Sequence, residues 1–186
     1  MPALIGNVEI HGHAIVSDDD CIAGPDGLTP AALRNDADWA YFQAALDAAA
    51  FTVLGRRGHE ANPNAKARRR VVVSSSSGGL EGRGDGHWWN PAHVAFASVA
   101  AMSAPGGGVA AVPGGRDVFG LFLRIGFDAF HLVRAEGVRI AGGRKLFPGC
   151  ADGRDAERVL KEAGLSLARS SWLDRAANVR LDLWRR

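Results

Sequence analysis

Apolar and polar positions in the first part of the chain follow first a strand pattern and then a helix pattern. Val8–Ser17 is a mostly apolar run and predicts a largely buried first strand. Pro30–Arg34 predicts a short helical turn. The apolar side chains that come next recur at helical spacing, and they belong to Trp39, Phe42, Leu46 and Ala49. This spacing predicts a helix over Asp36–Ala50 with one buried face.

The start of this helix contains the first candidate for chemistry. Either Asn35 or Asp36 can serve as the N-cap, which places Asp38 in the first turn, beside the predicted buried face. Phe51–Leu54 follows as a strand that Gly55 ends. We therefore expect one pocket in which the acid handles a proton and the Gly-Arg turn after the strand holds an anion.

The middle of the chain combines an apolar run with glycine-rich sequence. Val71–Val73 predicts a strand buried on both faces, as in a parallel sheet. Gly78–Pro91 is rich in glycine and is expected to be irregular, although it contains two adjacent tryptophans. His93–Ala97 predicts another short strand, and Ser98 the cap of a brief helix that ends at Met102.

A strand, a glycine pair and a helix then follow one another. Val109–Val112 predicts the strand, Gly114 and Gly115 the turn, and Arg116–Leu123 the helix. Glycines allow a ligand to approach the backbone closely, and the start of a helix offers unpaired amides, so this arrangement suits a pyrophosphate group. The GxGxxG fingerprint of Rossmann domains is absent from the sequence.

The last third of the chain predicts a strand, a helix and a strand pair. The strand is Phe127–Ala135 and the helix is Asp155–Ala163. Leu165–Trp172 and Val179–Trp184 alternate in polarity and are expected to pair antiparallel. The chain as a whole, residues 1–186, is expected to form a single α/β domain.

Composition and charge exclude several classes of function. A net charge of +2 gives no indication of nucleic-acid binding. The two cysteines form no CxxC motif, so neither a disulfide framework nor a structural zinc site is expected, and no metal site is predicted. The segment MPALIGNVEIHGHA lacks the features of a signal peptide, and Ala44–Gly55 is too short to cross a bilayer. We expect a cytoplasmic protein that binds no membrane.

The segment that begins at Asp38 resembles the dihydrofolate reductase fold. Phe42 follows Asp38 by four residues, and after a short strand come Gly55, Arg56 and Glu60. The same order is found in true dihydrofolate reductases and in the reductase (C-terminal) domain of bifunctional riboflavin-biosynthesis enzymes. The resemblance implies three layers, α/β/α, with a mostly parallel central sheet and an antiparallel C-terminal strand pair.

The end of the first strand adds to the resemblance. Ser17, Asp19, Ile22 and Ala23 match the Ser-x-Asp-Gly and Ile-Ala residues of the riboflavin-type reductases, where this loop closes over the nicotinamide. Asp20 stands where that family has glycine. Considered without the resemblance, the run of carboxylates that includes Asp20 fits a solvated acidic loop.

The resemblance also implies NADPH as the cofactor. Serines after the third strand would hydrogen-bond the 2′-phosphate, although they equally fit a flexible loop, and Arg56 could equally be a surface arginine. Gly58 replaces a usual threonine, and Phe119 a usual tyrosine. The implied cofactor-binding residues are Ala14, Ile22, Gly55, Arg56, Ser74, Ser75, Gly114, Gly115, Arg116, Asp117 and Val118.

Three functions follow from the resemblance. The first is a riboflavin-type reductase acting on an aminouracil, and the second is a dihydrofolate reductase in which Asp38 handles the proton. In both, Asp19 and Phe42 would contact a small heterocyclic substrate. The third is a non-catalytic nucleotide-binding relative, which the replaced family residues favour. The zinc-deaminase motif of the bifunctional enzymes is absent from the sequence, and a homodimer is possible.

Overall fold

The structure is a computed structural model that describes residues 7–186, so the start of the MPALIGNVEIHGHA segment lies outside the described residues. The first elements are β1 (Val8–Val16), β2 (Cys21–Ala23), the 3-10 turn η1 (Ala31–Leu33), α1 (Asp36–Ala48), β3 (Phe51–Gly55), α2 (Arg56–Ala61) and β4 (Arg70–Val73). The middle elements are β5 (Leu80–Arg83), β6 (Gly86–Trp89), α3 (Phe96–Ser103), β7 (Gly108–Gly114) and α4 (Arg116–Ile125). The last elements are β8 (Ala129–Ala135), β9 (Arg144–Lys145), the 3-10 turn η2 (Pro148–Asp152), α5 (Ala156–Glu162), β10 (Ser166–Asp174) and β11 (Val179–Arg185).

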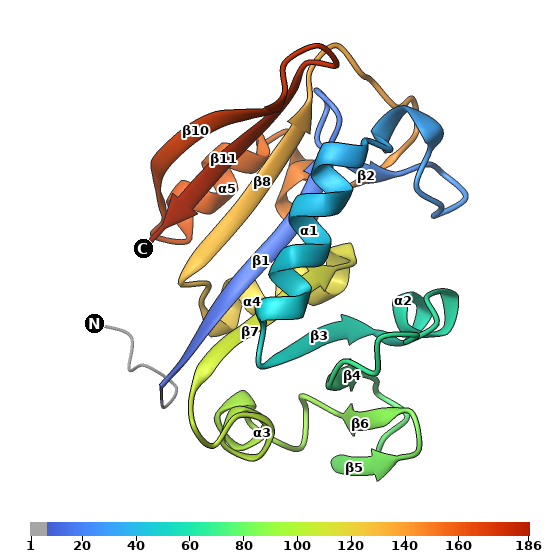
Figure 1. The fold of residues 1–186 in the computed structure, drawn as a ribbon, viewed down its shortest axis with the longest axis vertical. Helices are drawn as coiled ribbons and strands as arrows, with labels where there is room; N and C mark the ends of the chain where they lie inside the picture. Colours follow the sequence, from blue (N-terminus) through green and yellow to red (C-terminus); the bar gives the residue numbers. More distant parts are fainter. Residues whose placement is uncertain (1–6) are drawn as a thin grey trace.

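A nine-stranded sheet in the order β10-β11-β8-β1-β7-β3-β4-β6-β5 organises the molecule (Figure 1). The strands from β8 to β6 in this order run parallel to their neighbours. The outer strands of this sheet pair antiparallel, β11 with β8 and β10, and β5 with β6. The short strands β2 and β9 form a separate antiparallel pair. The predicted sheet and the predicted antiparallel C-terminal pair are both confirmed.

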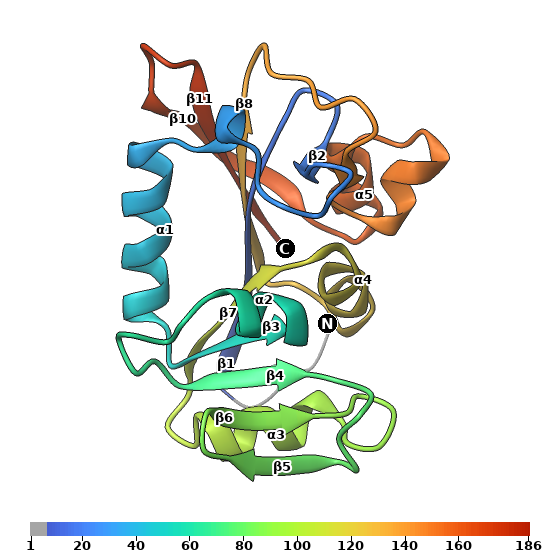
Figure 2. The ribbon, with the colours of Figure 1, turned by 90° about the vertical axis from the view of Figure 1, so that its right-hand side faces the viewer.

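Helices cover both faces of this sheet, which confirms the three layers. Figure 2 shows the sheet between α1 on one side and α4 and α5 on the other. The main apolar core lies on the side of α4, and its aromatic members contact one another in tilted or edge-to-face arrangements. These fully buried rings are Phe119, Phe122, Phe127, Phe130 and Phe147.

Helix α1 begins as predicted but buries a different set of residues. Asn35 is the N-cap, and its side-chain oxygen accepts hydrogen bonds from the amides of Ala37 and Asp38. Leu46 is buried, whereas Trp39 is 59% exposed, so the prediction that Trp39 is buried was wrong. Phe42, one turn further on, faces the sheet, and its ring lies near that of His13. The Trp39 ring lies farther from the sheet, 6.0 Å from the Phe42 ring.

The segment predicted to be irregular contains a β-hairpin instead. Strands β5 and β6 are joined by two residues, and β6 extends the parallel sheet beside β4. This pairing buries both tryptophans. Trp89 joins the main core, and the Trp88 indole donates a hydrogen bond to Asp85, 3.0 Å away. The sequence pattern did not indicate the hairpin, because β6 is held in the sheet by β4, a strand that lies outside the glycine-rich segment.

Helix α3 replaces the predicted strand over His93–Ala97. It begins at Phe96, with Ala95 at the N-cap position, so the cap predicted at Ser98 was also wrong. Its buried residues recur at helical spacing, and they are Phe96, Val99, Ala100 and Ser103. The Phe96 ring lies near the rings of Phe51, Trp89 and Phe122, and these contacts favour a helix that begins at Phe96.

The alternation of the C-terminal strand pair predicts that Leu165, Leu167, Val179, Leu181 and Leu183 point one way. Leu165, Val179 and Leu181 are buried and Leu183 is partly buried, but Leu167 is 50% exposed. β10 is the outer strand of the sheet, and its register with β11 shifts between Leu167 and Arg169. The irregularity and the open edge leave Leu167 outside the core.

Candidate active site at the carboxyl edge of the sheet

The loops that contain most of the predicted cofactor residues open at one edge of the sheet. Strands β1, β7, β3 and β4 are consecutive neighbours and run parallel, so their carboxyl ends lie at the same edge of the sheet. The segments that follow these ends are the acidic loop after β1, the α2 start after β3, the serines after β4 and the glycine pair before α4. In parallel α/β sheets this edge is where ligands bind.

The glycine pair between β7 and α4 requires glycine for two different reasons. Gly114 has φ 96°, and a Cβ atom there would lie 2.2 Å from the Phe119 ring. Gly115 has φ 74° and is the N-cap residue of α4, but a Cβ there would meet nothing within 4 Å. The backbone at Gly115 therefore faces open space at the start of a ten-residue helix, which fits a phosphate-bearing ligand.

The end of β3 lies beside this turn. A Cβ atom on Gly55 would come within 3.3 Å of Val118, so two predicted cofactor segments are in contact. The Arg56 side chain is 55% exposed, with its Nε 4.0 Å from Glu60. Arg116, also exposed, lies 3.5 Å from the Asp117 carboxylate. Both arginines thus lie at the same edge and are accessible to an anion.

The serines after β4 form an ordered turn. Ser74 is buried, and its hydroxyl lies 2.8 Å from that of Ser76 and accepts a hydrogen bond from the Ser76 amide. Ser75 is exposed, and its carbonyl accepts a hydrogen bond from Asn90. Of the two predicted cofactor serines, Ser74 and Ser75, the exposed one is therefore Ser75.

Asp19 in the loop after β1 is held by its neighbours. Partial burial opposes ionisation, but hydrogen bonds from the Ser17 hydroxyl and the Ile140 amide outweigh it and lower the Asp19 pKa. The structure therefore gives Asp19 a role in fixing this loop. The nearby cofactor candidates Ala14 and Ile22 are partly buried and pack against the main core.

Asp20 is a buried residue, so its interpretation as part of a solvated loop was wrong. Its φ of 59° is the left-handed conformation that glycine adopts easily, which is consistent with the family's glycine at this place. Its carboxylate accepts hydrogen bonds from Arg134 at 2.9 Å and from the Ala156 amide at 3.0 Å. Arg134 also binds Glu157 at 2.6 Å. The partners lie more than a hundred positions along the chain, which hid them from the sequence pattern.

Asp38 has the environment expected of a catalytic acid. It lies in the first turn of α1, one turn before Phe42. Burial raises its pKa from 3.8 to about 6. At pH values near neutrality the carboxyl group can therefore both hold and release a proton.

The sequence analysis missed a polar cluster on the same face of the sheet as α1. It consists of His11 and His13 of β1 and His131 of β8, with the Tyr41 hydroxyl 2.5 Å from His131 Nδ1. The signal was the spacing of the two β1 histidines, since residues two apart on a strand face the same side. His131 comes 118 positions after His13, so only the fold brings it to them.

An open cleft of about 1080 Å³ lies away from the candidate site. Its lining includes Arg69 and Arg70, where β4 begins, and Gly86 and His87, where β6 begins. These are the amino ends of parallel strands, opposite to the edge that carries Ser74 and the glycine pair. The cleft is therefore not part of the predicted cofactor site.

Comparison with known proteins shows similarity in structure alone. No protein-family model matches the chain, and no curated protein matches its sequence. A deaminase/5-amino-6-(5-phosphoribosylamino)uracil reductase from Thermotoga maritima superposes with a TM-score of 0.69 at 12% identity, covering 96% of this chain and 56% of that one. The chain therefore spans little more than half the length of the Thermotoga maritima protein. It has the dihydrofolate reductase-like fold.

Two further structures with this fold match over nearly their whole length. Dihydrofolate reductase from Enterococcus faecalis, complexed with NADP(H) and RAB-propyl, has a TM-score of 0.65 and 16% identity, and 96% of each chain is covered. A Shewanella sp. PV-4 protein provisionally described as a riboflavin biosynthesis protein has a TM-score of 0.64 and 17% identity, covering 96% of this chain and 98% of that one.

Two expectations concern properties outside the fold. None of the helices within residues 7–186 combines the length and apolar character that crossing a bilayer requires. The homodimer stays a prediction.

Proposed function

We propose that this protein is an NADPH-dependent reductase that transfers a hydride to a pyrimidine-type or pteridine-type substrate. The observation that carries the proposal is the convergence of four loops at the carboxyl edge of the sheet, together with a partly buried acid in α1. The residues proposed to hold NADPH are those already implied by the resemblance, with Gly115 and Gly55 at the centre and Arg56 and Arg116 beside them.

The chain's own residues would bind NADPH, orient it against the substrate and protonate the substrate. NADPH, when bound, supplies the hydride. The open backbone at Gly115 and the start of α4 would receive its phosphates, and the exposed Arg56 would add positive charge. Asp38, whose pKa burial raises to about 6, would hold the proton that the substrate needs. Phe42, one turn further along α1, would contact the substrate ring.

The favoured substrate is 5-amino-6-ribosylaminouracil phosphate. Ser17, Asp19 and Ile22 carry the riboflavin-type pattern, and the structure joins Ser17 to Asp19 by a 2.7 Å hydrogen bond. The family's glycine position is taken by Asp20, which keeps the left-handed backbone. This departure therefore leaves the loop conformation compatible with the riboflavin-type reading.

Reduction of dihydrofolate is the second candidate. The raised pKa of Asp38, with Phe42 one turn away, favours it. The third reading, a non-catalytic relative, is supported by Phe119, whose fully buried ring packs under Gly114 and brings no hydroxyl to the site.

The deciding experiment is to follow NADPH oxidation by the purified protein with each substrate in turn. Turnover of the aminouracil supports the main proposal, and turnover of dihydrofolate supports the second candidate. Asp38→Asn is expected to lower turnover far more than NADPH affinity. NADPH binding with no turnover of either substrate would favour the non-catalytic reading.

A further inference from the structure

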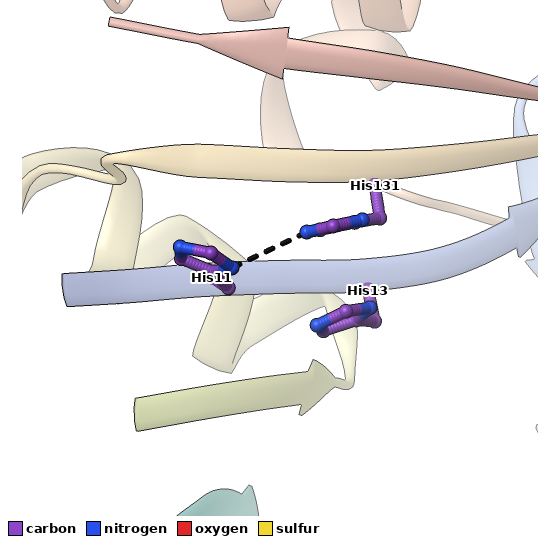
Figure 3. A group of neighbouring side chains, drawn as sticks. All are labelled: His11, His13 and His131. Carbon is purple, nitrogen blue, oxygen red and sulfur yellow. Dashed lines mark hydrogen bonds between the residues drawn. The ribbon is translucent and has the colours of Figure 1, made fainter. Parts of the chain in front are cut away.

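We propose that His11, His13 and His131 form a binding site for a divalent transition-metal ion. Each offers one ring nitrogen, and these nitrogens lie within 4.8 Å of one another. In Figure 3 the rings of His11 and His13 lie along β1 and the ring of His131 projects from β8, with a dashed line between His131 and His11. The site goes beyond the proposed reductase function, because none of the three histidines is assigned to its cofactor or substrate.

The fold places these side chains together through strand register. His11 and His13 alternate with Gly12 on β1, so both face α1, and His131 is the partner of His13 in the β1–β8 ladder. Gly12 faces the opposite side, where a Cβ atom would lie 2.3 Å from the Phe130 ring. The His-Gly-His segment thus combines a close-packed core on one face with two imidazoles on the other.

Two of the three nitrogens already have the spacing of metal ligands. His131 Nε2 lies 3.3 Å from His11 Nδ1. Two nitrogens that each bind zinc at about 2.0–2.1 Å with a tetrahedral angle stand roughly 3.3 Å apart. The His13 ring stacks on His131 with centroids 4.2 Å apart and planes 14° apart. His13 must therefore turn its ring to direct a nitrogen at the ion.

The remaining nitrogens of His11 and His131 have the outer partners typical of metal ligands. His11 Nε2 lies 2.9 Å from the Glu9 carboxylate, and His131 Nδ1 lies 2.5 Å from the Tyr41 hydroxyl. Such hydrogen bonds orient a ligating imidazole and fix which nitrogen faces the metal. Binding requires the His131 proton to reside on Nδ1, where the Tyr41 oxygen can accept it, leaving the Nε2 lone pair for the ion.

The three donor atoms are imidazole nitrogens. His13 is buried, and His11 and His131 are partly buried. Neutral imidazoles retain a lone pair for coordination. Three such ligands suit zinc, copper, nickel or cobalt better than magnesium or calcium, which prefer oxygen.

Cobalt titration tests this site directly. Protein stripped with a chelator is titrated with Co²⁺ while visible absorption is recorded, and Zn²⁺ is then added as competitor. We expect one equivalent of Co²⁺ with the intense bands of a four-coordinate or five-coordinate ion, and displacement by Zn²⁺. His11→Gln and His131→Gln each remove a ligand and should weaken Co²⁺ binding tenfold or more. Glu9→Gln removes the hydrogen-bond partner of a ligand and should weaken Co²⁺ binding about 10-fold to 100-fold.

The matched control is His59→Gln. His59 also pairs with a carboxylate, Asp85, 2.7 Å away, but it does not belong to the three-histidine group. Its replacement should leave Co²⁺ affinity unchanged. Equal weakening by His59→Gln, or wild-type protein that gives only the weak absorption of six-coordinate Co²⁺, would overturn the site.

Glu9→Gln keeps the test decisive if the histidine variants unfold. The Glu9 side chain is 49% exposed, so its replacement should not disturb the core. Thermal unfolding without metal identifies which variants remain folded. Unchanged Co²⁺ affinity in folded Glu9→Gln would contradict the proposed geometry. The titration contains no NADPH, so its result is independent of the reductase proposal.

Discussion

The two faces of the central sheet differ although the same strands build both. On β8, Phe130 and Leu132 point into the aromatic core beneath α4, whereas His131 and Val133 point toward α1. Within residues 7–186, the smaller apolar cluster has three buried members, Val133, Val179 and Leu181, with Tyr41 of α1 packed against it. The three histidines lie on the same face. The α4 face is therefore expected to provide most of the stability, and the α1 face the polar chemistry.

This division indicates how a small α/β protein accommodates costly groups. Buried imidazoles and a carboxylate such as Asp38 destabilise the folded state unless they are paired. The core on the other face offsets this cost through the burial of large rings. The comparison can be tested by substitutions on each face.

The largest expected effect is that of Phe130→Ala in the aromatic core. Phe130 is fully buried and lies near the rings of Phe119, Phe127 and Phe147. Its removal leaves a cavity and should cost about 3–5 kcal/mol in the free energy of unfolding, measured by urea denaturation. His131→Gln, the next residue on the opposite face, should cost less than half as much. Equal costs would contradict the division between the faces.

Arg134→Met should follow, at about 3 kcal/mol, because Arg134 is a buried charged residue of β8. Its loss leaves the buried Asp20 carboxylate without its cationic partner. The urea midpoint measures the effect. The double variant Asp20→Asn with Arg134→Met should recover part of the stability, and no recovery would mean that the two side chains are not coupled.

Gly114→Ala is expected to cost about 2–3 kcal/mol. Its positive φ and the contact of a Cβ atom with Phe119 both oppose a side chain. Gly115→Ala has a similar φ but no such contact, so it should cost only about 1 kcal/mol and should instead weaken NADPH binding. Thermal unfolding and NADPH titration of both variants separate the two effects.

Asp38→Asn should stabilise the protein by about 2 kcal/mol at pH 7.5, less than the full pKa difference gives because the side chain is partly exposed. The folded pKa is raised from 3.8 to about 6, so the folded state binds more protons between these values. The contribution of Asp38 to stability should therefore fall as pH rises from about 4 to about 6 and change little above. Urea denaturation across this range should show the wild type losing stability relative to Asp38→Asn. The same pH dependence in both proteins would contradict a raised pKa at Asp38.

The sequence predicted the parts of the fold that depend on local pattern. The strand of Val71–Val73, the helix after Asn35 and the glycine pair at residues 114 and 115 follow from apolar runs, caps and turn residues. The order of parallel strands then places their loops at one edge. Little of this required knowledge of distant partners.

The failures occur where a distant partner decides the environment. Asp20 is buried because Arg134 reaches it from β8, and Trp88 is buried because β6 pairs with β4. His131 joins the β1 histidines only through the parallel ladder. No local pattern contains these contacts, so solvent exposure and the polar cluster could not be predicted.

The central claim is that the loops at the carboxyl edge bind NADPH, and the most direct test is a fluorescence titration. Wild-type protein and Arg56→Ala are titrated with NADPH and with NADH. The account predicts micromolar binding of NADPH, weaker binding of NADH, and a clear loss of NADPH affinity in Arg56→Ala. The account would be contradicted if folded wild-type protein did not bind NADPH. It would also be contradicted if NADPH and NADH bound with equal affinity and Arg56→Ala bound NADPH as tightly as the wild type.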